Sequence, residues 1–308
     1  MNTNQKAIQA LENNDYNQAM GLFTLALKES RDVQSLTNLA WLYYYDDTDS
    51  QSAIQLLVEA IQLKPTSHFP YSLLGEIYVT SKRWKQAKEV LQCSIQITES
   101  EVSLHNLAAA SYHLQEVEEA SRLFQKSAIK GSNVSLYAYT KCLIDLGRDK
   151  EAKEQVKIIS LNEDDFVGEL EVADLYYELC SYDLANQWYQ QSWDDYYKEP
   201  DWIQRYAYSL LQSGDNKKAT DIVNQAMSEK EDEIEDAFNE ECDEDWSVLE
   251  KDEFIQTLDE QRQEYKQMME KLMTGYRPCV KFEAAALTAC YLFGCQRHHH
   301  REYSFESK

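Results

Sequence analysis

Small and large apolar residues recur along the chain with a helical spacing, in units of 32 to 35 residues. The stretch "YSLLGEIYVTSKRWKQAKEVL" (71–91) is followed by a blurred copy, "LHNLAAASYHLQEVEEASRLF" (104–124). An alanine marks each unit: Ala19, Ala53, Ala87, Ala120, Ala152, Ala185 and Ala219. A bulky residue follows each alanine by four positions: Phe23, Leu57, Leu91, Phe124, Val156, Tyr189 and Val223.

Each unit holds two apolar segments joined by a turn, as at "NNDY", "LGRD" and "SGDN". Spacings of three and four are helical, and a small residue facing a large one lets two helices approach closely. The unit is therefore predicted to be a helical hairpin. A single hairpin cannot bury its apolar face, so neighbouring hairpins are expected to stack into a solenoid. The chain contains only eight Gly and four Pro, which also favours helices.

This pattern resembles the tetratricopeptide repeat (TPR) family over residues 1–228, as seven repeats. The third repeat has that family's signature residues: Tyr71, Leu74, Gly75, Tyr78, Ala87 and Leu91. Pro65 occupies the terminal proline of the second repeat. The fifth repeat departs from the pattern, with Thr140 at the close-packing position and Ile159 later. The resemblance implies an all-α, right-handed α-solenoid with C-terminal capping helices.

The resemblance also implies where a ligand would bind, because the first helix of each hairpin lines the inner curve in this family. Transferring the family's register onto this sequence gives a set of candidate contacts that is rich in aromatic residues. These are Asn38, Trp41, Tyr44, Tyr45, Phe69, Glu76, His105, Asn106, Tyr112, His113, Tyr137, Lys141, Asp174, Tyr177, Arg205 and Tyr208.

An aromatic concave groove favours a non-catalytic scaffold or adaptor that binds a peptide or helix, because aromatic side chains dominate interface energetics. The alternative is that single aromatic residues only pack between hairpins. The net charge of −24 argues against binding nucleic acid or an anionic membrane. It suits an apolar partner segment flanked by Lys or Arg. Basic residues that could clamp a terminal carboxylate are scarce in the candidate set, with only Lys141 and Arg205.

Half of the net negative charge lies in residues 229–253, which hold 14 acidic and 2 basic residues. Residues 229–246 are predicted to be a solvated acidic linker or frayed helix. The alternative is a docking strip, in which case the protein would be a regulator or assembly factor that sequesters a basic protein. The spacing of the acids lacks the central Gly of a calcium-binding loop.

Residues 247–308 are predicted to form a helical cap and tail. The helix from Ser247 to Met273 has apolar residues seven apart and ends before Gly275, so it could cap the solenoid or form a short coiled coil. In the tail, Cys290, Cys295 and His298 could bind Zn²⁺. The alternative is that the two cysteines are small buried residues of an apolar helix. A metal-binding or enzymatic tail is therefore a second alternative function.

No catalytic motif and no cofactor fingerprint stands out in the sequence. The first residues lack the features of a signal peptide, and the seven cysteines are scattered instead of forming a disulfide framework. These observations lead us to expect a cytoplasmic protein that is not an enzyme and uses no cofactor.

Overall fold

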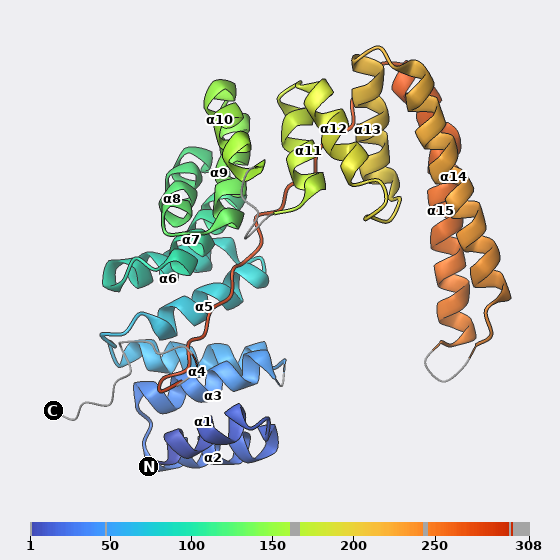
Figure 1. Ribbon diagram of the computed structural model, residues 1–308. Helices are drawn as coiled ribbons and strands as arrows, with labels where there is room; N and C mark the ends of the chain where they lie inside the picture. Colours follow the sequence, from blue (N-terminus) through green and yellow to red (C-terminus); the bar gives the residue numbers. More distant parts are fainter. Residues whose placement is uncertain (1, 47, 161–166, 243–245, 296, 298–308) are drawn as a thin grey trace. The chain divides into compact units, whose positions relative to one another are not determined.

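The computed structural model describes residues 2–46, 48–160, 167–242, 246–295 and 297. Within these residues the chain forms fifteen α-helices and no strand, so the all-α prediction is confirmed (Figure 1). The helices fall into two compact units: unit 1 is residues 1–146 with 283–308, and unit 2 is residues 147–282. None of the described helices is long and apolar enough to cross a membrane.

Unit 1 contains four helical hairpins and one further helix. Its helices are α1 (Thr3–Glu12), α2 (Tyr16–Glu29), α3 (Val33–Tyr45), α4 (Ser50–Gln62), α5 (Phe69–Thr80), α6 (Trp84–Ile97), α7 (Glu101–His113), α8 (Val117–Ile129) and α9 (Asn133–Asp145). Each helix packs against the next one along the chain. Hydroxyl groups bridge successive hairpins in the interior: Ser72 Oγ lies 2.8 Å from Ser94 Oγ and 2.9 Å from Ser103 Oγ.

Unit 2 contains α10 (Asp149–Ser160), α11 (Glu169–Glu178), α12 (Tyr182–Gln191), α13 (Pro200–Gln212), α14 (Asn216–Asn239) and α15 (Val248–Met273). The boundary between the units falls inside the predicted fifth hairpin, between α9 and α10. This is the repeat that has Thr140 and Ile159 where small residues are expected.

The predicted repeat positions are the core of both units. All seven marker alanines have no exposed surface, and the bulky residues four positions later are at most 3% exposed. The turns recur with the same period, because one residue between the two helices of each repeat has a positive φ angle. These residues are Asn14, Thr48, Lys82, Gln115, Gly147, Cys180 and Gly214. The first helix of each hairpin is thus followed by one turn residue in the left-handed conformation.

Gly75 marks a close approach of two helices in unit 1. A Cβ atom added there would lie 2.4 Å from Cγ and Cδ2 of Leu91, on the partner helix of the same hairpin. We expect Gly75→Ala to lower the free energy of unfolding by about 1–3 kcal/mol, because overpacking forces Leu91 to move. Urea denaturation measures this change. Gly21→Ala is the matched control, since nothing lies within 4 Å of its added Cβ and the helix gains stability. Equal effects of the two substitutions would contradict the close packing.

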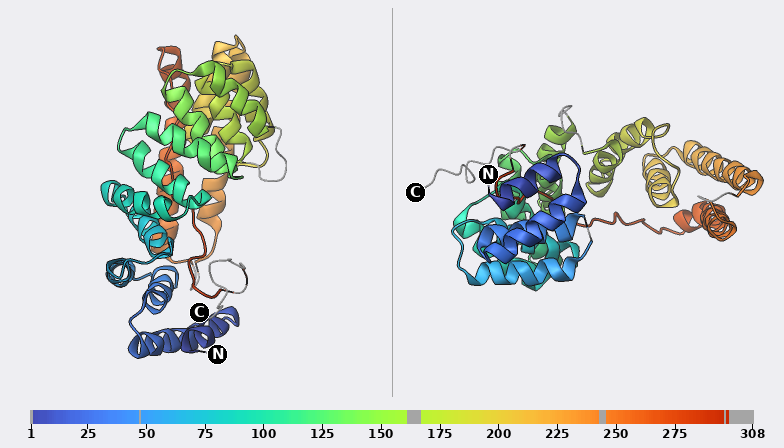
Figure 2. Two further views of the ribbon diagram at one scale, coloured as in Figure 1. Left: turned by 90° about the vertical axis from the view of Figure 1, so that its left-hand side faces the viewer. Right: turned by 90° about the horizontal axis from the view of Figure 1, so that it is seen from below.

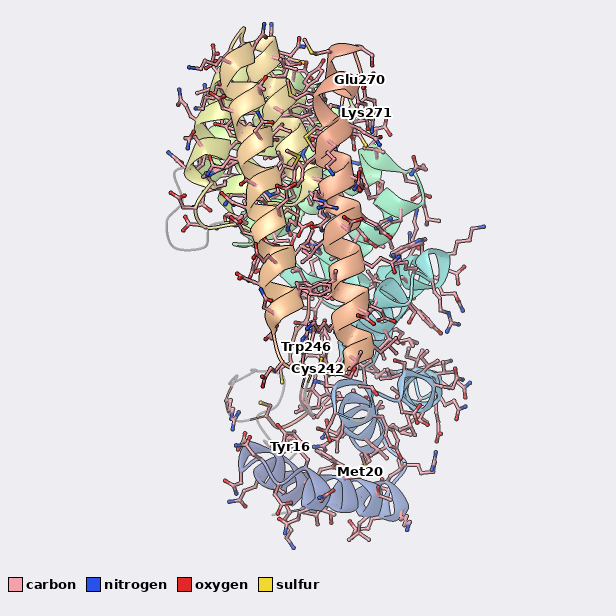
Figure 3. All side chains as sticks on the ribbon, turned by 90° about the vertical axis from the view of Figure 1, so that its right-hand side faces the viewer. Tyr16, Met20, Cys242, Trp246, Glu270 and Lys271 are labelled. Carbon is pink, nitrogen blue, oxygen red and sulfur yellow. The ribbon has the colours of Figure 1, made fainter. Side chains whose placement is uncertain are left out.

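The structure changes the description of the acidic stretch. Residues 229–239 are the second half of α14, so only residues after Asn239 leave the helix before α15 begins. In α14, Lys230 and Ala237 are buried, and the helix packs along α15 (Figure 3).

On α15 the buried residues are Leu258, Tyr265, Met268 and Leu272, which include the predicted residues seven apart. This helix also packs against α13, and Gly275 follows its end with a φ of 91°.

The segment after Gly275 is not helical, contrary to the expectation of an apolar helix around Cys290. Residues 276–292 form no regular secondary structure. In unit 1, the segment that begins at Glu283 runs across α7, α5 and α3 and reaches α1 (Figures 1 and 2). These helices bury four of its side chains, Ala284, Tyr291, Leu292 and Cys295, and its backbone bonds to their side chains. It therefore does not need a helix to bury apolar surface or to satisfy its peptide groups.

Candidate functional site

The candidate site is the face of α3, α5 and α7 against which residues 283–295 lie. We call these residues the tail segment, and we call this face of the three helices the inner face. Both belong to unit 1. The tail segment runs opposite to the order of the repeats, with Ala285 and Leu287 bonded to α7 and Phe293 bonded to α3.

Two asparagines of the inner face hold the backbone of the tail segment. Asn106 on α7 donates from Nδ2 to the carbonyl of Leu287 (2.8 Å) and accepts at Oδ1 from its N–H (2.7 Å). Asn38 on α3 forms the same pair with Phe293, at 3.1 Å and 2.7 Å. Both asparagine side chains are fully buried. A side-chain amide that bonds both polar groups of one residue satisfies that residue's backbone as a neighbouring β-strand would.

Two histidines of α7 add bonds to carbonyl groups at the start of the tail segment. His105 Nε2 lies 3.0 Å from the carbonyl oxygen of Ala285, and His113 Nε2 lies 3.2 Å from that of Ala284. A nitrogen that faces a carbonyl must donate its proton. Burial lowers the pKa of His105 to about 4, so this ring is neutral at physiological pH. Trp84 of α6 stacks on the His113 ring, with 3.9 Å between the ring centroids.

The other end of the tail segment is held by apolar contacts. Tyr291 is buried and meets Phe69 edge-on, with 5.3 Å between ring centroids, and Phe293 packs against the same ring. Leu292 and Cys295 are buried in a cluster with Ile8 of α1 and other residues of α1–α3. At the first end, Lys82 pairs with Glu283 (2.8 Å), but both side chains are mostly exposed, so the pair adds little stability.

A buried carboxyl group lies beneath the middle of the tail segment. Glu76 of α5 has no exposed surface and accepts a hydrogen bond from the Tyr45 hydroxyl. Burial raises the pKa of Glu76 to about 7, although Tyr45 and the backbone of Ala289 stabilise the charged form. The phenol of Tyr291 and that of Tyr44 also lie near this carboxyl group. Because the tail segment covers Glu76, its departure would return the carboxyl to water and lower its pKa.

This carboxyl predicts that docking of the tail segment depends on pH. With the tail docked the pKa of Glu76 is about 7, and in water it would fall toward its ordinary value of 4.5. Docking therefore takes up a proton, and it weakens as the pH rises through this window, by up to about tenfold per pH unit. We expect proteolysis of the tail segment, normalised to the free peptide at each pH, to be faster at pH 7.5 than at pH 5.5.

Glu76→Gln is the control for this prediction, because it keeps the shape of the side chain and cannot ionise. The variant should show the same normalised rate at both pH values. A pH dependence that persists in Glu76→Gln would assign the effect to another group and contradict the prediction.

The structure brings eight of the predicted site residues to the tail segment or the space beside it. Asn38, Phe69, Glu76, His105, Asn106 and His113 interact with the tail segment. Trp41 and Tyr45 line a pocket with it. Elsewhere in unit 1, the hydroxyl of Tyr44 bonds to Thr80 and that of Tyr112 to Asp145. On α9, Tyr137 is half-buried and Lys141 is buried.

The remaining predicted residues lie in unit 2, where they form a separate set. Arg205 of α13 donates from Nε to the buried carboxylate of Asp174 (2.7 Å), which also accepts from the Tyr189 hydroxyl (2.5 Å). The Tyr177 hydroxyl donates to the carbonyl of Pro278 (2.7 Å). Its ring meets that of Tyr208 edge-on.

The sequence reasoning missed the tail segment itself, together with Lys82 of the α5–α6 turn and Trp84 of α6. The signal that could have found it is the run "AAALTACYLFG", the most apolar stretch of the chain, which follows a helix stop and Pro278. Such a run must be buried by something, and it is too short to span a membrane.

The two cysteines of the tail segment, Cys290 and Cys295, are shielded from solvent to different degrees. Cys295 is buried and Cys290 is partly buried, and burial raises the pKa of Cys290 to about 12. His298, the third residue of the predicted metal site, lies outside the described residues. Across the described part of the chain, no group of three His, Cys, Asp or Glu side chains could hold a metal ion.

Comparison with solved structures identifies the fold. The C-terminal part of a TPR repeat-containing protein from Cytophaga hutchinsonii matches with a TM-score of 0.57, at 15% identity over 73% of this chain and 94% of that one. A tetratricopeptide repeat protein from Parabacteroides merdae matches with a TM-score of 0.53, at 17% identity over 79% and 93%. No protein-family model and no curated protein matches the sequence. The chain therefore has the tetratricopeptide-repeat fold, as the repeat pattern predicts.

Proposed function

We propose that the protein is a non-catalytic interaction scaffold whose inner face binds an extended segment of a partner protein. One observation carries the proposal: Asn106 and Asn38 each form a pair of hydrogen bonds with one residue of an extended chain. The tail segment occupies the face as such a partner would. Peptide recognition through main-chain bonds plus side-chain pockets is a recurring mode of binding.

The contacts indicate the chemistry of the partner segment. Its backbone is bonded at two residues six positions apart, equivalent to Leu287 and Phe293. Its side chains are mainly apolar and small, as in the tail segment, because they pass over Phe69 and the cluster around Ile8. Basic residues flanking the segment would speed its encounter with a protein of net charge −24.

The tail segment competes with such a partner because it is joined to the same chain. A tethered segment acts at an effective concentration in the millimolar range when its linker lets it reach the site. An external peptide should therefore bind weakly to the wild-type protein and more tightly to a variant whose own tail segment is released.

The test uses a fluorescent peptide of residues 283–297 with Cys290→Ser and Cys295→Ser, titrated against the full chain and followed by anisotropy. The released variant is Leu287→Pro with Phe293→Pro, because proline has no N–H to donate to Asn106 and Asn38. We expect saturable binding that is at least about tenfold tighter to this variant than to wild type.

Adding Asn38→Ala and Asn106→Ala to the released variant should then weaken peptide binding at least about tenfold. Thr288→Pro is the matched control, because the Thr288 side chain is exposed and lies between the two bonded residues. Absence of peptide binding to every form, or binding that survives loss of both asparagines, would contradict the proposed function.

A further inference from the structure

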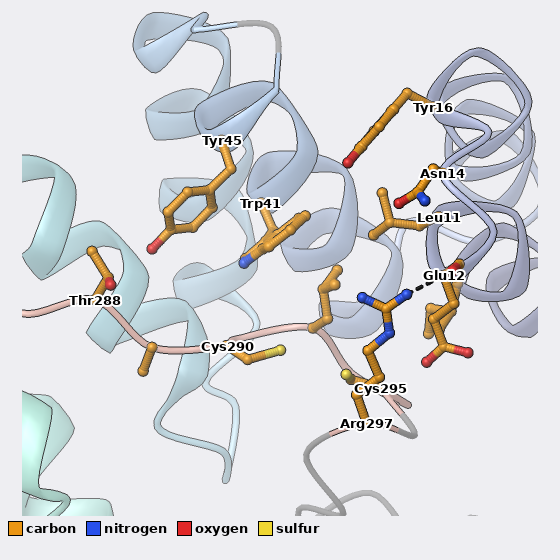
Figure 4. Close-up of a pocket in the computed structure, with 13 residues that line it drawn as sticks. Leu11, Glu12, Asn14, Tyr16, Trp41, Tyr45, Thr288, Cys290, Cys295 and Arg297 are labelled. Atoms are coloured by element: carbon orange, nitrogen blue, oxygen red, sulfur yellow. Dashed lines mark hydrogen bonds between the residues drawn. The ribbon is translucent and has the colours of Figure 1, made fainter. Parts of the chain in front are cut away.

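A pocket of about 440 Å³ remains beside the tail segment in unit 1 (Figure 4). Its walls come from Ile8 and Leu11 of α1, Tyr16 of α2, and Trp41 and Tyr45 of α3. The tail segment forms the remaining wall with small residues that include Thr288, Ala289 and Cys290. The volume lies in the range of pockets that bind ligands.

The alternation of side chains along the extended tail segment explains why Cys290 borders this pocket. Successive side chains of an extended chain point to opposite sides. Tyr291 points to Phe69, whereas Cys290 and Leu292 both pack against the α1–α3 cluster that contains Ile8. A side chain at position 290 therefore lies on the pocket side, midway between the residues bonded by Asn106 and Asn38.

The pocket is lined mainly by apolar side chains, together with polar residues that include Glu12, Asn14 and Arg297. The indole Nε1 of Trp41 is buried and has no hydrogen-bond partner within the described residues. The Arg297 side chain, on the same rim, donates to the carbonyl of Glu12 (2.6 Å). A buried donor without a partner costs about 1–3 kcal/mol, which an acceptor brought by a ligand would recover.

We infer that this pocket is a specificity subsite, and that the partner of the inner face carries a tyrosine at the position that Cys290 occupies in the tail segment. The inference rests on the proposed function. A tyrosine combines a large apolar ring, which fits walls made of Ile8, Leu11 and Trp41, with a hydroxyl that can accept from the indole. The tail segment, with a small residue there, leaves the pocket unfilled and can be displaced by a segment that fills it.

The test compares two fluorescent peptides of residues 283–297, both with Cys295→Ser, one with Cys290→Ala and one with Cys290→Tyr. They are titrated against the full chain carrying Leu287→Pro and Phe293→Pro. We expect the tyrosine peptide to bind about tenfold more tightly or better, because a large side chain leaves water.

The same titrations with Trp41→Ala, and separately with Tyr16→Ser, show whether the gain comes from this pocket. Both variants should reduce the advantage of the tyrosine peptide to about threefold or less, and the alanine peptide should bind the Tyr16→Ser variant as before. Tyr16 is 45% exposed, so its replacement leaves the fold intact. Circular dichroism checks that both variants keep their helices.

The outcomes separate the inference from the proposed function. If both peptides bind with equal affinity, or if the advantage of tyrosine is unchanged in both pocket variants, the subsite is wrong and the inner face remains a binding site. If neither peptide binds to the released variant, the proposed function fails and the subsite fails with it.

Discussion

Replacing Asn38 and Asn106 with alanine is expected to release the tail segment and to speed amide exchange of Leu287 and Phe293 by at least about 25-fold. Each asparagine makes two hydrogen bonds to the backbone of one residue. At about 0.5–1.5 kcal/mol for each bond, the loss of four bonds costs roughly 2–6 kcal/mol. A tenfold change in the opening equilibrium corresponds to about 1.4 kcal/mol, so the lower end of this range is an increase of about 25-fold in the exchange rate.

Hydrogen exchange of the full chain, followed by mass spectrometry of peptides that cover residues 283–295, measures this release. The matched control is Asn186→Ala, which removes an asparagine hydrogen bond to Ser213 in unit 2 (3.0 Å). The control should leave exchange of the tail segment unchanged. If the double variant also exchanges like wild type, apolar contacts alone hold the tail segment and the role assigned to the asparagines is wrong.

The second large effect is expected in unit 2, where Arg205→Met should lower the free energy of unfolding by about 3–5 kcal/mol, because the substitution leaves a buried charge unpaired. Asp174 is 8% exposed, and Arg205 is the cation that pairs with it at 2.7 Å. Burial raises the pKa of Asp174 even with Arg205 present, so its carboxylate depends strongly on this partner. Tyr189 supplies only a neutral hydroxyl.

Urea unfolding followed by tryptophan fluorescence reports this change, because Trp202 stacks near Tyr189 and contacts Trp193 in the same unit. Two further variants define the mechanism. Asp201→Ala removes a half-exposed carboxylate from Arg205 and should cost about 1 kcal/mol or less. The double variant Arg205→Met, Asp174→Leu should recover most of the stability, because no unpaired charge remains. An Arg205→Met protein as stable as wild type would contradict the prediction.

The repeat architecture was predictable because each hairpin needs a small residue where its helices meet. Ala87 and Leu91 are fully buried and Leu91 lies opposite Gly75, which is the arrangement expected from their spacing. The turns were predictable where the left-handed residue is Asn14, Gly147 or Gly214. The turns could not be predicted where Lys82 or Gln115 adopts the same conformation, because these residue types rarely have a positive φ.

Only the part of the candidate site that the helices contribute was predictable from the sequence. The register of the repeats placed Asn38 and Asn106 on the inner face, and both bond to the tail segment there. The conformation of the tail segment could not be predicted from its own residues. An apolar run of this length is compatible with a helix or an extended chain, and the choice depends on contacts with helices far away in sequence.

The extension of α14 to Asn239 could not be predicted from the sequence for a similar reason. The density of acids after Met227 suggested a solvated linker, whereas packing against α15 stabilises the helix through Lys230 and Ala237. Lys230 is buried beside Glu233, with 2.8 Å between Nζ and Oε2. Tertiary packing can override the local preference of such a segment.

The most direct test of the central claim is to locate an external peptide on the protein by photo-crosslinking. The probe is the peptide of residues 283–297 with both cysteines replaced by serine and photo-leucine at the position of Leu292, added to the Leu287→Pro, Phe293→Pro variant. In the tail segment Leu292 packs in the cluster that contains Ala7, Ile8, Leu39 and Leu42. Binding to the inner face predicts adducts concentrated in α1 and α3. Adducts in unit 2, or adducts spread over the surface without preference, would contradict the claim that this face binds an extended segment.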